Sequence, residues 1–371
     1  MNFLTLKKAM IAGCVMLQMG WAMDAAARPF GKPLEAEVLV TQPSPHAALN
    51  TAMGQSLKKK VMLMNFPLSQ EQRKALFTAK VKKSFRVKTA LSKTSDLPAA
   101  LDIGMNDVPV LDQGMHGSCV TFAATAAVDA VLGKGDYVSQ LCQLELGDFL
   151  ERVTMSYIPG GWDGSIAPWV LDQMMRYGIV SKETQQRSSC AGITEYPLKD
   201  NMNNGNPMST GEFSLHSEPL IGRVFYSQLM SYEQRINAKF TDTDHAFDVL
   251  SDIKHAIVSG HRVMFSTFVV MSPYCGVGAC AKHNQLQDTW ALTDEINTPP
   301  YGMGGHEMVI TGFDDNGTAT DSKGNVHTGL LVLRNSWGET VGDNGNYYMT
   351  YDYFVKFVTD AHEVGPVDLF Y

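Results

Sequence analysis

The chain has 371 residues, of which 44% are hydrophobic and 18% are charged, so it can bury a large core and is not globally disordered. The formal net charge is −8, and residues 99–371 hold 15 Lys and Arg against 33 Asp and Glu, a net of −18. Phosphate repels so acidic a body, which argues against nucleic-acid binding.

Residues 1–27 have the pattern of a secretory signal peptide. Lys7 and Lys8 precede a 15-residue apolar run, and the small residues 25–27 follow it. The run is short for a membrane-spanning helix, which needs about 20 residues. We therefore expect a secreted protein, periplasmic or extracellular, with no membrane anchor after the signal is removed.

Residues 28–96 form a basic, polar and weakly periodic segment. Residues 28–98 hold 13 Lys and Arg against 4 Asp and Glu, a net of +9. Within the segment, residues 69–87 predict a helix with Ser69 as N-cap and Gln72 in the capping-box position. The segment is either a solvated linker or a partner that docks on the acidic body. We favour docking through charge, which salt should weaken.

The composition turns apolar, acidic and rich in glycine near residues 97–98, where we place the start of a second domain, 97–371. Its pattern predicts helices first and strands second, which indicates an α+β fold with two lobes. The expected helices are 118–132, 167–177 and 244–259. The expected strands are 262–271, 307–313, 330–334 and 347–351, with a polar hairpin loop over 316–328.

Six cysteines are present, at positions 14, 119, 142, 190, 275 and 280. Loss of Cys14 with the signal leaves five, so at least one thiol is free in an oxidising compartment. Cys275 and Cys280 are close enough to close a small disulfide loop. With His283 they could instead supply three zinc ligands, but the spacing is loose and we favour the disulfide.

Cys119 lies in the first turn of an expected buried helix, with Ser118 as its N-cap. The positive end of the helix dipole should lower the pKa of its thiol and favour the nucleophilic thiolate. Gln113 precedes it by six residues, so its amide could join the Cys119 backbone N–H in an oxyanion hole.

A base and its orienting group follow in the predicted strands. His306 begins one strand after two glycines, and Asn335 ends the next strand. A hairpin would bring the Asn335 amide beside the His306 ring, where it could orient the imidazole. Trp337 could shield that hydrogen bond from water.

These residues resemble the motifs of papain-like (C1 family) cysteine peptidases. The nucleophile segment is matched by Gln113–Phe122, the histidine block by Gly305–Asp315 and the asparagine block by Leu333–Gly338. Gly160 and Gly161 stand where the family has a loop whose backbone binds substrate, and Trp337 lies beside the same cleft. The resemblance covers roughly residue 97 to the end of the chain.

The resemblance implies a papain-like α+β fold, with a helical lobe, a β-barrel-like lobe and the active-site cleft between them. It implies a secreted cysteine endopeptidase in which Cys119, His306, Asn335 and Gln113 are catalytic, with a thioester intermediate and no metal or organic cofactor. The partners would be a peptide or protein substrate and the chain's own residues 28–96, an inhibitory prosegment. We expect a monomer.

Departures from the family pattern lie around the nucleophile. The family has a bridged cysteine pair where this chain has His116 and Ile158, so Cys142 and Cys190 are candidates for a substitute staple. His116 is either a packing replacement or a second imidazole that perturbs the thiol, and we favour packing. Val120 replaces the family's Trp.

Two other functions stay open at this stage. Because Val120 and His116 alter the cleft, the chain could be a catalytically weak or silent papain-like protein that binds peptides or a protein partner. It could also transfer the acyl group to an acceptor other than water. The sequence does not separate endopeptidase, exopeptidase and transferase activity, and it does not define the substrate.

Overall fold

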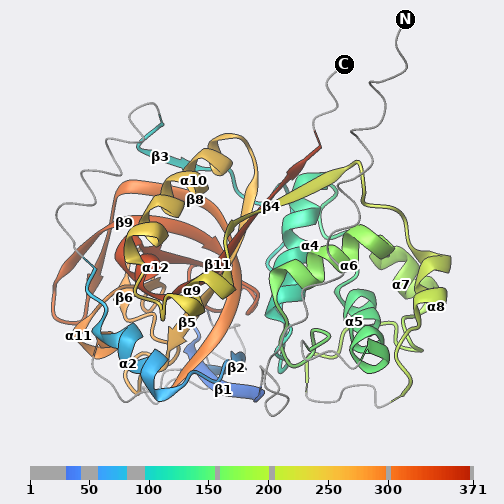
Figure 1. The fold of residues 1–371 in the computed structure, drawn as a ribbon, viewed down its shortest axis with the longest axis horizontal. Coiled ribbons are helices and arrows are strands. Elements are labelled where there is room, and N and C mark those ends of the chain that lie inside the picture. Colours follow the sequence, from blue (N-terminus) through green and yellow to red (C-terminus); the bar gives the residue numbers. More distant parts are fainter. Residues whose placement is uncertain are drawn as a thin grey trace, which may run out of the picture.

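One side of the molecule is mainly helical and the other holds the sheet with further helices on it, so the chain forms two lobes (Figure 1). The computed structural model describes residues 31–42, 57–81, 97–154, 159–199, 205–297 and 302–367. The predicted α+β two-lobe fold is confirmed. The expected signal peptide, residues 1–27, lies outside the described residues. Among the helices that are described, none is long and apolar enough to cross a bilayer.

The helical lobe is built around α4 (Cys119–Leu132), which is apolar on almost every side and almost entirely buried. Such a helix belongs in an interior, surrounded by other elements. It ends at Gly133, which has the left-handed φ of 62° found at many helix ends. The helices around it are α5 (Gln140–Thr154), α6 (Ala167–Tyr177), α7 (Lys182–Ser188) and α8 (Thr210–His216).

Two disulfides join four of the five cysteines that the structure describes. One links Cys142 of α5 to Cys190, and the other closes the small loop between Cys275 and Cys280. Both predicted pairings are confirmed, and the zinc alternative is wrong because both of its sulfur ligands are in a disulfide. Cys119 is therefore the free thiol of the described residues.

The second lobe is a large, mostly antiparallel sheet. Its strands follow the order β4–β11–β5–β8–β6–β7–β10–β9, and β9 pairs again with β8, so the pairings from β8 to β9 form a ring. The ring is incomplete as a barrel wall, because two of its strands are only two residues long. The strands are β3 (Ala100–Asp102), β4 (Val224–Met230), β5 (Arg262–Val270), β6 (Ala281–Lys282), β7 (Thr289–Trp290), β8 (Met303–Asp321), β9 (Val326–Arg334), β10 (Asn346–Thr350) and β11 (Val358–Pro366).

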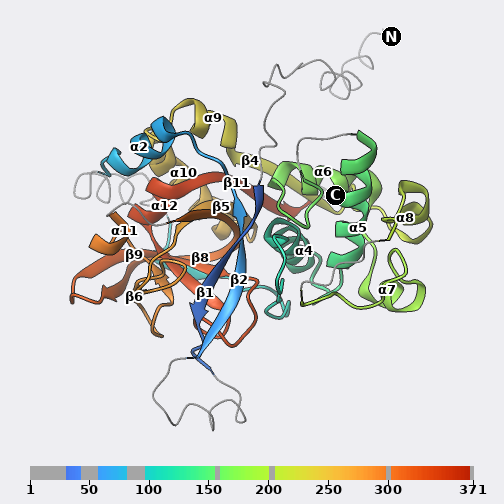
Figure 2. The same cartoon turned by 90° about the horizontal axis from the view of Figure 1, so that it is seen from below.

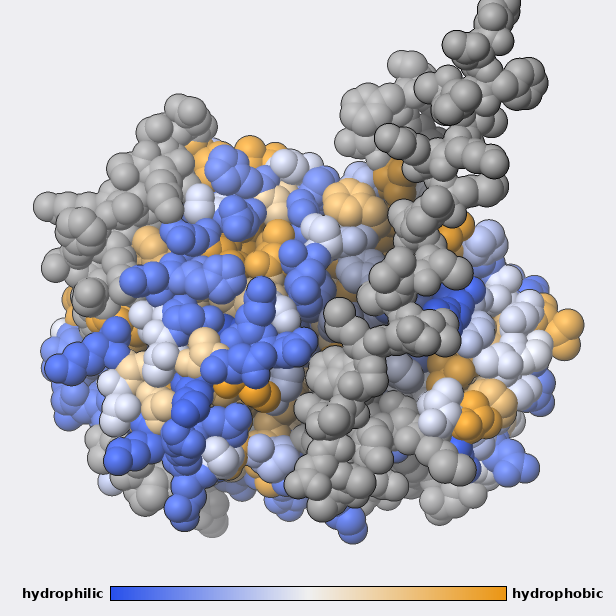
Figure 3. Space-filling view, in the orientation of Figure 1, coloured by the Kyte–Doolittle hydropathy of each residue, from blue (hydrophilic) through white to orange (hydrophobic). Residues whose placement is uncertain are grey.

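Helices cover the sheet on its outer side, where Figure 3 shows a mainly hydrophilic surface. A buried ion pair between Lys254 and Asp315 fastens one of these helices to β8. The helices are α9 (Tyr232–Asn237), α10 (Thr243–Val258), α11 (Asp294–Asn297) and α12 (Tyr351–Phe357).

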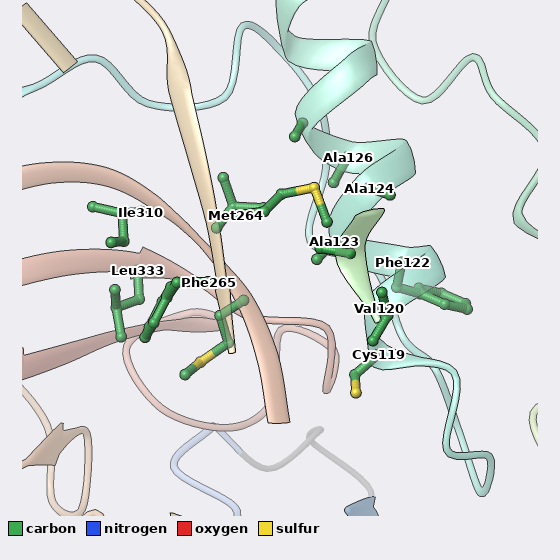
Figure 4. Close-up of a cluster of buried hydrophobic side chains, with 14 of the residues drawn as sticks. Cys119, Val120, Phe122, Ala123, Ala124, Ala126, Met264, Phe265, Ile310 and Leu333 are labelled. Carbon is green, nitrogen blue, oxygen red and sulfur yellow. The ribbon is translucent and has the colours of Figure 1, made fainter. Parts of the chain in front are cut away.

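The lobes meet where α4 packs against β5, β8 and β11. Figure 4 shows Met264 extending from β5 to α4, with Cys119 at the first turn of the same helix. This contact places the start of α4 beside the sheet, and it is the place where side chains of the two lobes can meet.

Residues 31–42 and 57–81, here called the N-terminal segment, lie across the junction of the lobes (Figure 2). They form β1 (Gly31–Leu39), β2 (Lys58–Asn65) and α2 (Gln70–Thr78). The first two pair with each other, and β2 also pairs with β8 through Met64 and Gly305. The sequence analysis predicted a weakly periodic segment with one helix, and it missed the two strands.

The predicted helices and strands mostly match the structure to within one residue at each end, and the larger differences are in α2, β8 and β9. The capping box of Ser69 and Gln72 is present, but α2 ends at Thr78, not at residue 87. Residues 82–96 lie outside the described part of the chain. The helix over 167–177 is confirmed, and the expected hairpin loop over 316–328 is mostly strand, since β8 and β9 continue through it.

Candidate active site

Cys119 is the first residue of α4 and is fully buried. Ser118 precedes it, but the Ser118 hydroxyl makes no capping bond and lies 2.9 Å from the Tyr196 hydroxyl. Burial raises the pKa of the Cys119 thiol to about 12, against smaller lowering by nearby backbone N–H groups, first that of Glu307. The predicted thiolate is therefore wrong for this form of the chain, because desolvation outweighs the helix dipole.

His306 and Asn335 meet as the hairpin prediction requires. The antiparallel pairing of β8 and β9 brings their strand ends together, and His306 Nε2 donates to Asn335 Oδ1 over 2.7 Å. The backbone N–H of Ser336 also donates to Asn335 Oδ1, at 2.7 Å, which fits an oxygen at that position. In the neutral ring, Nδ1 then carries no proton and can accept one.

The indole of Trp337 covers the histidine. Its ring stacks on His306 with centroids 4.4 Å apart and planes 20° apart. Both residues are fully buried, and burial lowers the pKa of His306 to about 4 despite the hydrogen bond with Asn335. Trp337 thus lies where it excludes water from the His306–Asn335 bond, whereas its contact with substrate stays a prediction.

The expected nucleophile, Cys119, and the expected base, His306, come from different lobes. The backbone of Glu307, the residue after His306, lies close enough to the Cys119 sulfur to offset part of the rise that burial causes in the pKa of its thiol. Nδ1 of His306 is buried and has no hydrogen-bond partner among the described residues. The site therefore holds a thiol close to the backbone of the histidine and a ring nitrogen that is free to take its proton.

Gln113 is held by several hydrogen bonds from both sides. Its Oε1 accepts from the Ser336 hydroxyl at 2.8 Å, and its Nε2 donates to the His116 carbonyl oxygen at 2.8 Å. Nε2 also donates to the carbonyl oxygen of Met62 in β2, at 3.3 Å. The expected oxyanion donor is thus directed at a peptide carbonyl of the N-terminal segment.

The N-terminal segment contacts the site at further points. Lys59 donates to the carbonyl oxygen of Trp337 over 2.8 Å and forms an ion pair with Asp112. The other described ion pair between the segment and the rest of the chain joins Glu71 to Lys239. Here the segment carries the negative charge, whereas we expected a positively charged segment on an acidic body. Buried apolar residues are more numerous: Ala36, Val38, Val61, Leu63, Met64, Phe66 and Leu76. Apolar burial therefore contributes more to this contact than the predicted charge attraction.

Gly160 and Gly161 lie beside the start of α4. A Cβ at Gly160 would come within 2.3 Å of the Gly147 backbone in α5, so only glycine permits this close approach. A Cβ at Gly161 would lie 2.9 Å from the Thr121 hydroxyl, in the first turn of α4. Gly161 therefore lies beside a residue that follows Cys119 by two positions in the chain. Contact of the loop with substrate stays a prediction.

His116 has the surroundings of a packing residue. Its ring lies edge-on to Trp162 and to Tyr196, with centroids 5.0 and 5.7 Å apart. Its Nε2 donates to the Pro197 carbonyl oxygen over 2.7 Å. Ile158, at the other position of the lost cysteine pair, lies outside the described residues.

The sequence reasoning missed the residues that support Gln113. The Tyr196 hydroxyl donates to the Gln113 carbonyl oxygen over 2.8 Å, across 83 positions of sequence, and no local pattern signals such a contact. The contact of Met62 with Gln113 was not predicted either. The one signal for strands in this region is residues 35–38, which alternate Glu with small apolar residues as a strand does and which pair with the strand of Met62. In the described ranges, no cluster of three or more His, Cys, Asp or Glu side chains could hold a metal ion.

Comparison with known proteins found similar structures but no similar sequences. No family model matches the chain, and no curated protein matches it. Among solved structures it resembles xylellain, a cysteine protease from Xylella fastidiosa, with 16% identity, a TM-score of 0.45 and coverage of 78% of this chain and 91% of that one.

Two proenzymes are similar to the same degree. Digestive procathepsin L 3 of the Tenebrio molitor larval midgut shares 18% identity at a TM-score of 0.44, over 80% of this chain and 78% of that one. Procathepsin B S9 from Trypanosoma congolense shares 12% identity at a TM-score of 0.44, over 81% of each chain.

Proposed function

We propose that the chain is the precursor of a secreted papain-like cysteine endopeptidase, with Cys119, His306, Asn335 and Gln113 as its catalytic residues. One observation carries the proposal. A peptide carbonyl, that of Met62, accepts a hydrogen bond from Gln113 Nε2 at the junction where the buried thiol and the oriented imidazole meet. A substrate carbonyl would use the same donor.

The arrangement supports covalent acyl transfer. His306 Nδ1 takes the proton of the Cys119 thiol, and the sulfur attacks the carbonyl carbon of the substrate. Gln113 Nε2 donates to the oxyanion that forms, and preorganised donors of this kind are worth several kcal/mol. His306 then gives its proton to the leaving amine, and water hydrolyses the thioester. Asn335 keeps the ring oriented, and Trp337 keeps water away from that bond.

Residues 28–96 act as an inhibitory prosegment in this proposal. Met62 covers the oxyanion donor, and Cys119 is buried in this form so that its thiol stays protonated. The segment enters the junction through β2 and continues beyond it to α2. A cleft that accepts the middle of a chain in this way suits an endopeptidase. Secretion is supported by the two disulfides, which persist in oxidising compartments.

The test is covalent labelling with an epoxide inhibitor of papain-like enzymes. The full chain, a chain that starts at Leu97 and the latter with Cys119→Ala are compared by peptide mass mapping. We expect label on Cys119 alone, more of it without residues 28–96, and none in the Cys119→Ala protein. Absence of label from the folded, shortened chain would contradict a peptidase and favour a protein that only binds peptides.

A further inference from the structure

Three polar side chains form a buried row beside Cys119. Glu307 of β8 is paired in register with Ser266 of β5, which is paired with Asp360 of β11. All three are at most 3% exposed. Met264, two residues from Ser266 on the same strand, extends to α4, so this face of the sheet is turned toward that helix (Figure 4). The charge of Glu307 is one cause of the raised pKa of the Cys119 thiol.

The two carboxyl groups of this row lack the partners that buried acids need. Ser266 donates to one oxygen of Glu307, and Thr359 donates to one oxygen of Asp360 at 3.3 Å. The second oxygen of each group, Oε1 of Glu307 and Oδ1 of Asp360, is buried without a hydrogen bond. His362 Nδ1 lies 3.4 Å from Asp360 Oδ1 but makes no hydrogen bond with it. Neither acid has an ion pair with a described Lys or Arg.

Such an arrangement is costly, and it calls for a ligand or a function. Burial and the nearby charge of Asp360 raise the pKa of Glu307 well above its ordinary value. A buried carboxylate is normally paired with a cation or fully hydrogen-bonded. The mechanism described above uses neither acid, so the two free oxygens are left for something that binds at the junction.

A side chain of the N-terminal segment covers this row. The Phe66 ring lies over Gly305, whose Cβ, if it had one, would be 2.3 Å from the ring. Gly305 is paired with Phe268, and this pair is the next on the same face of the sheet after Glu307 and Ser266. The Phe66 ring is 6.1 Å from Phe268 and 5.5 Å from Tyr232, centroid to centroid.

The surroundings of Phe66 therefore combine an apolar wall with an acidic end. Burial and, to a smaller extent, the charge of Asp360 raise the pKa of Tyr232, the ring that packs on Phe66, so the acid acts on a neighbour of this side chain. Removal of the segment would leave a space with aromatic walls and two carboxyl groups whose oxygens lack partners.

We propose that Glu307 and Asp360 form the acidic end of a substrate pocket that selects a Lys or Arg side chain. The aliphatic stem would pack on Phe268 and Tyr232, and the cationic head would donate to the two free oxygens. This substrate class rests on the proposed peptidase function, since the pocket lies beside the nucleophile. In the precursor, Phe66 fills the apolar part and leaves the acidic end without a Lys or Arg partner among the described residues, His362 being the one basic side chain beside Asp360.

The charge preference can be measured in the full chain without any catalysis. Phe66→Lys and Phe66→Met place side chains of similar length in the pocket, with and without a positive charge. Alkylation of Cys119 by iodoacetamide, followed by intact-mass spectrometry, reports how often the segment leaves the site. We expect Phe66→Lys to label about tenfold or more slowly than Phe66→Met, as a desolvated charge pair would give.

The acids are then removed to assign the effect. In an Asp360→Asn background, and separately with Glu307→Gln, the advantage of Lys over Met should shrink or reverse. Glu363→Gln is the matched control, because this acid also lies on β11 but pairs with His261 instead. Faster labelling of Phe66→Lys than of Phe66→Met in the otherwise unchanged chain would overturn the proposal, and that comparison does not depend on the stability of the acid variants.

Peptide cleavage gives the second readout. The processed protein is offered quenched peptides that differ only by Arg, Lys, norleucine or Phe at each of the three residues before the cleaved bond. At one of these positions we expect Arg and Lys to exceed norleucine by about tenfold or more in kcat/KM. Cleavage without such a preference would overturn the acidic pocket and leave the peptidase intact. Failure to cleave any peptide would contradict the peptidase, while the labelling comparison still decides the pocket.

Discussion

Shortening one buried side chain of β2 should release the N-terminal segment and expose the nucleophile. Leu63 is fully buried, and its Cβ is the nearest atom to the position that a Cβ at Gly304 would take, just before His306. A buried Leu→Ala change costs about 2–5 kcal/mol. If this cost falls on docking, the open state becomes at least about thirtyfold more populated, since 1.36 kcal/mol is a factor of ten.

The assay is the rate of Cys119 alkylation at neutral pH, with intact-mass spectrometry to separate the precursor from any processed chain. We expect Leu63→Ala to label about thirtyfold faster or more. Leu215→Ala, at a site 81% exposed on α8, is the surface control and should match the unchanged chain. Leu250→Ala, in the core of α10, should lower the melting temperature without this acceleration. Equal labelling of Leu63→Ala and the unchanged chain would refute burial by the segment.

Three further outcomes follow from the site and its supports. Asn335→Ala removes the acceptor of the hydrogen bond from His306 Nε2. The kcat/KM of the processed enzyme for a fluorogenic peptide should therefore fall about tenfold to a hundredfold, which is the contribution of a hydrogen bond to a charged group. An unchanged kcat/KM would remove Asn335 from the mechanism. Burial lowers the pKa of His306 from 6.5 to about 4 in the docked form. If release of the segment rehydrates the ring, protonation favours the open state, so the nicked segment should stay bound above about pH 6.5 and dissociate as the pH falls toward 4. Equal retention on size exclusion at pH 7 and at pH 4.5 would contradict this. Alanine at both Cys142 and Cys190 opens a crosslink that spans 48 residues, so the free energy of unfolding should fall by about 4 kcal/mol in a denaturant titration; a change below about 1 kcal/mol would show that the helical lobe is held by packing alone.

The parts of the site that could be predicted from the sequence depend on short stretches of chain. Gly133 and the apolar run before it define α4, and thereby the position of Cys119 at its start. His306 lies near the start of β8 and Asn335 directly follows β9, and a hairpin brings such positions together whatever the rest of the fold does.

The parts that could not be predicted depend on contacts between distant segments. Tyr196 supports Gln113 from 83 positions away, and Met62 reaches the same side chain from a segment that reads as polar. The composition of that segment indicated a polar, solvated stretch because lysine is frequent in it. The apolar side chains at alternate positions of β2, such as Val61 and Leu63, are nevertheless buried. Net charge describes the attraction between two bodies at a distance, but it does not show which face of a strand is covered.

The protonation of Cys119 shows how such a distant contact can reverse a local rule. A helix N-terminus favours an anion by about 0.3–1 kcal/mol, which corresponds to less than one pKa unit. Burial acts in the opposite direction and raises the thiol pKa from 9.0 to about 12, which corresponds to about 4 kcal/mol. While the segment is docked, the larger effect wins and the sulfur stays neutral. If the segment leaves and water returns to the sulfur, the helix dipole again favours the thiolate, so we expect docking to set whether the sulfur is charged.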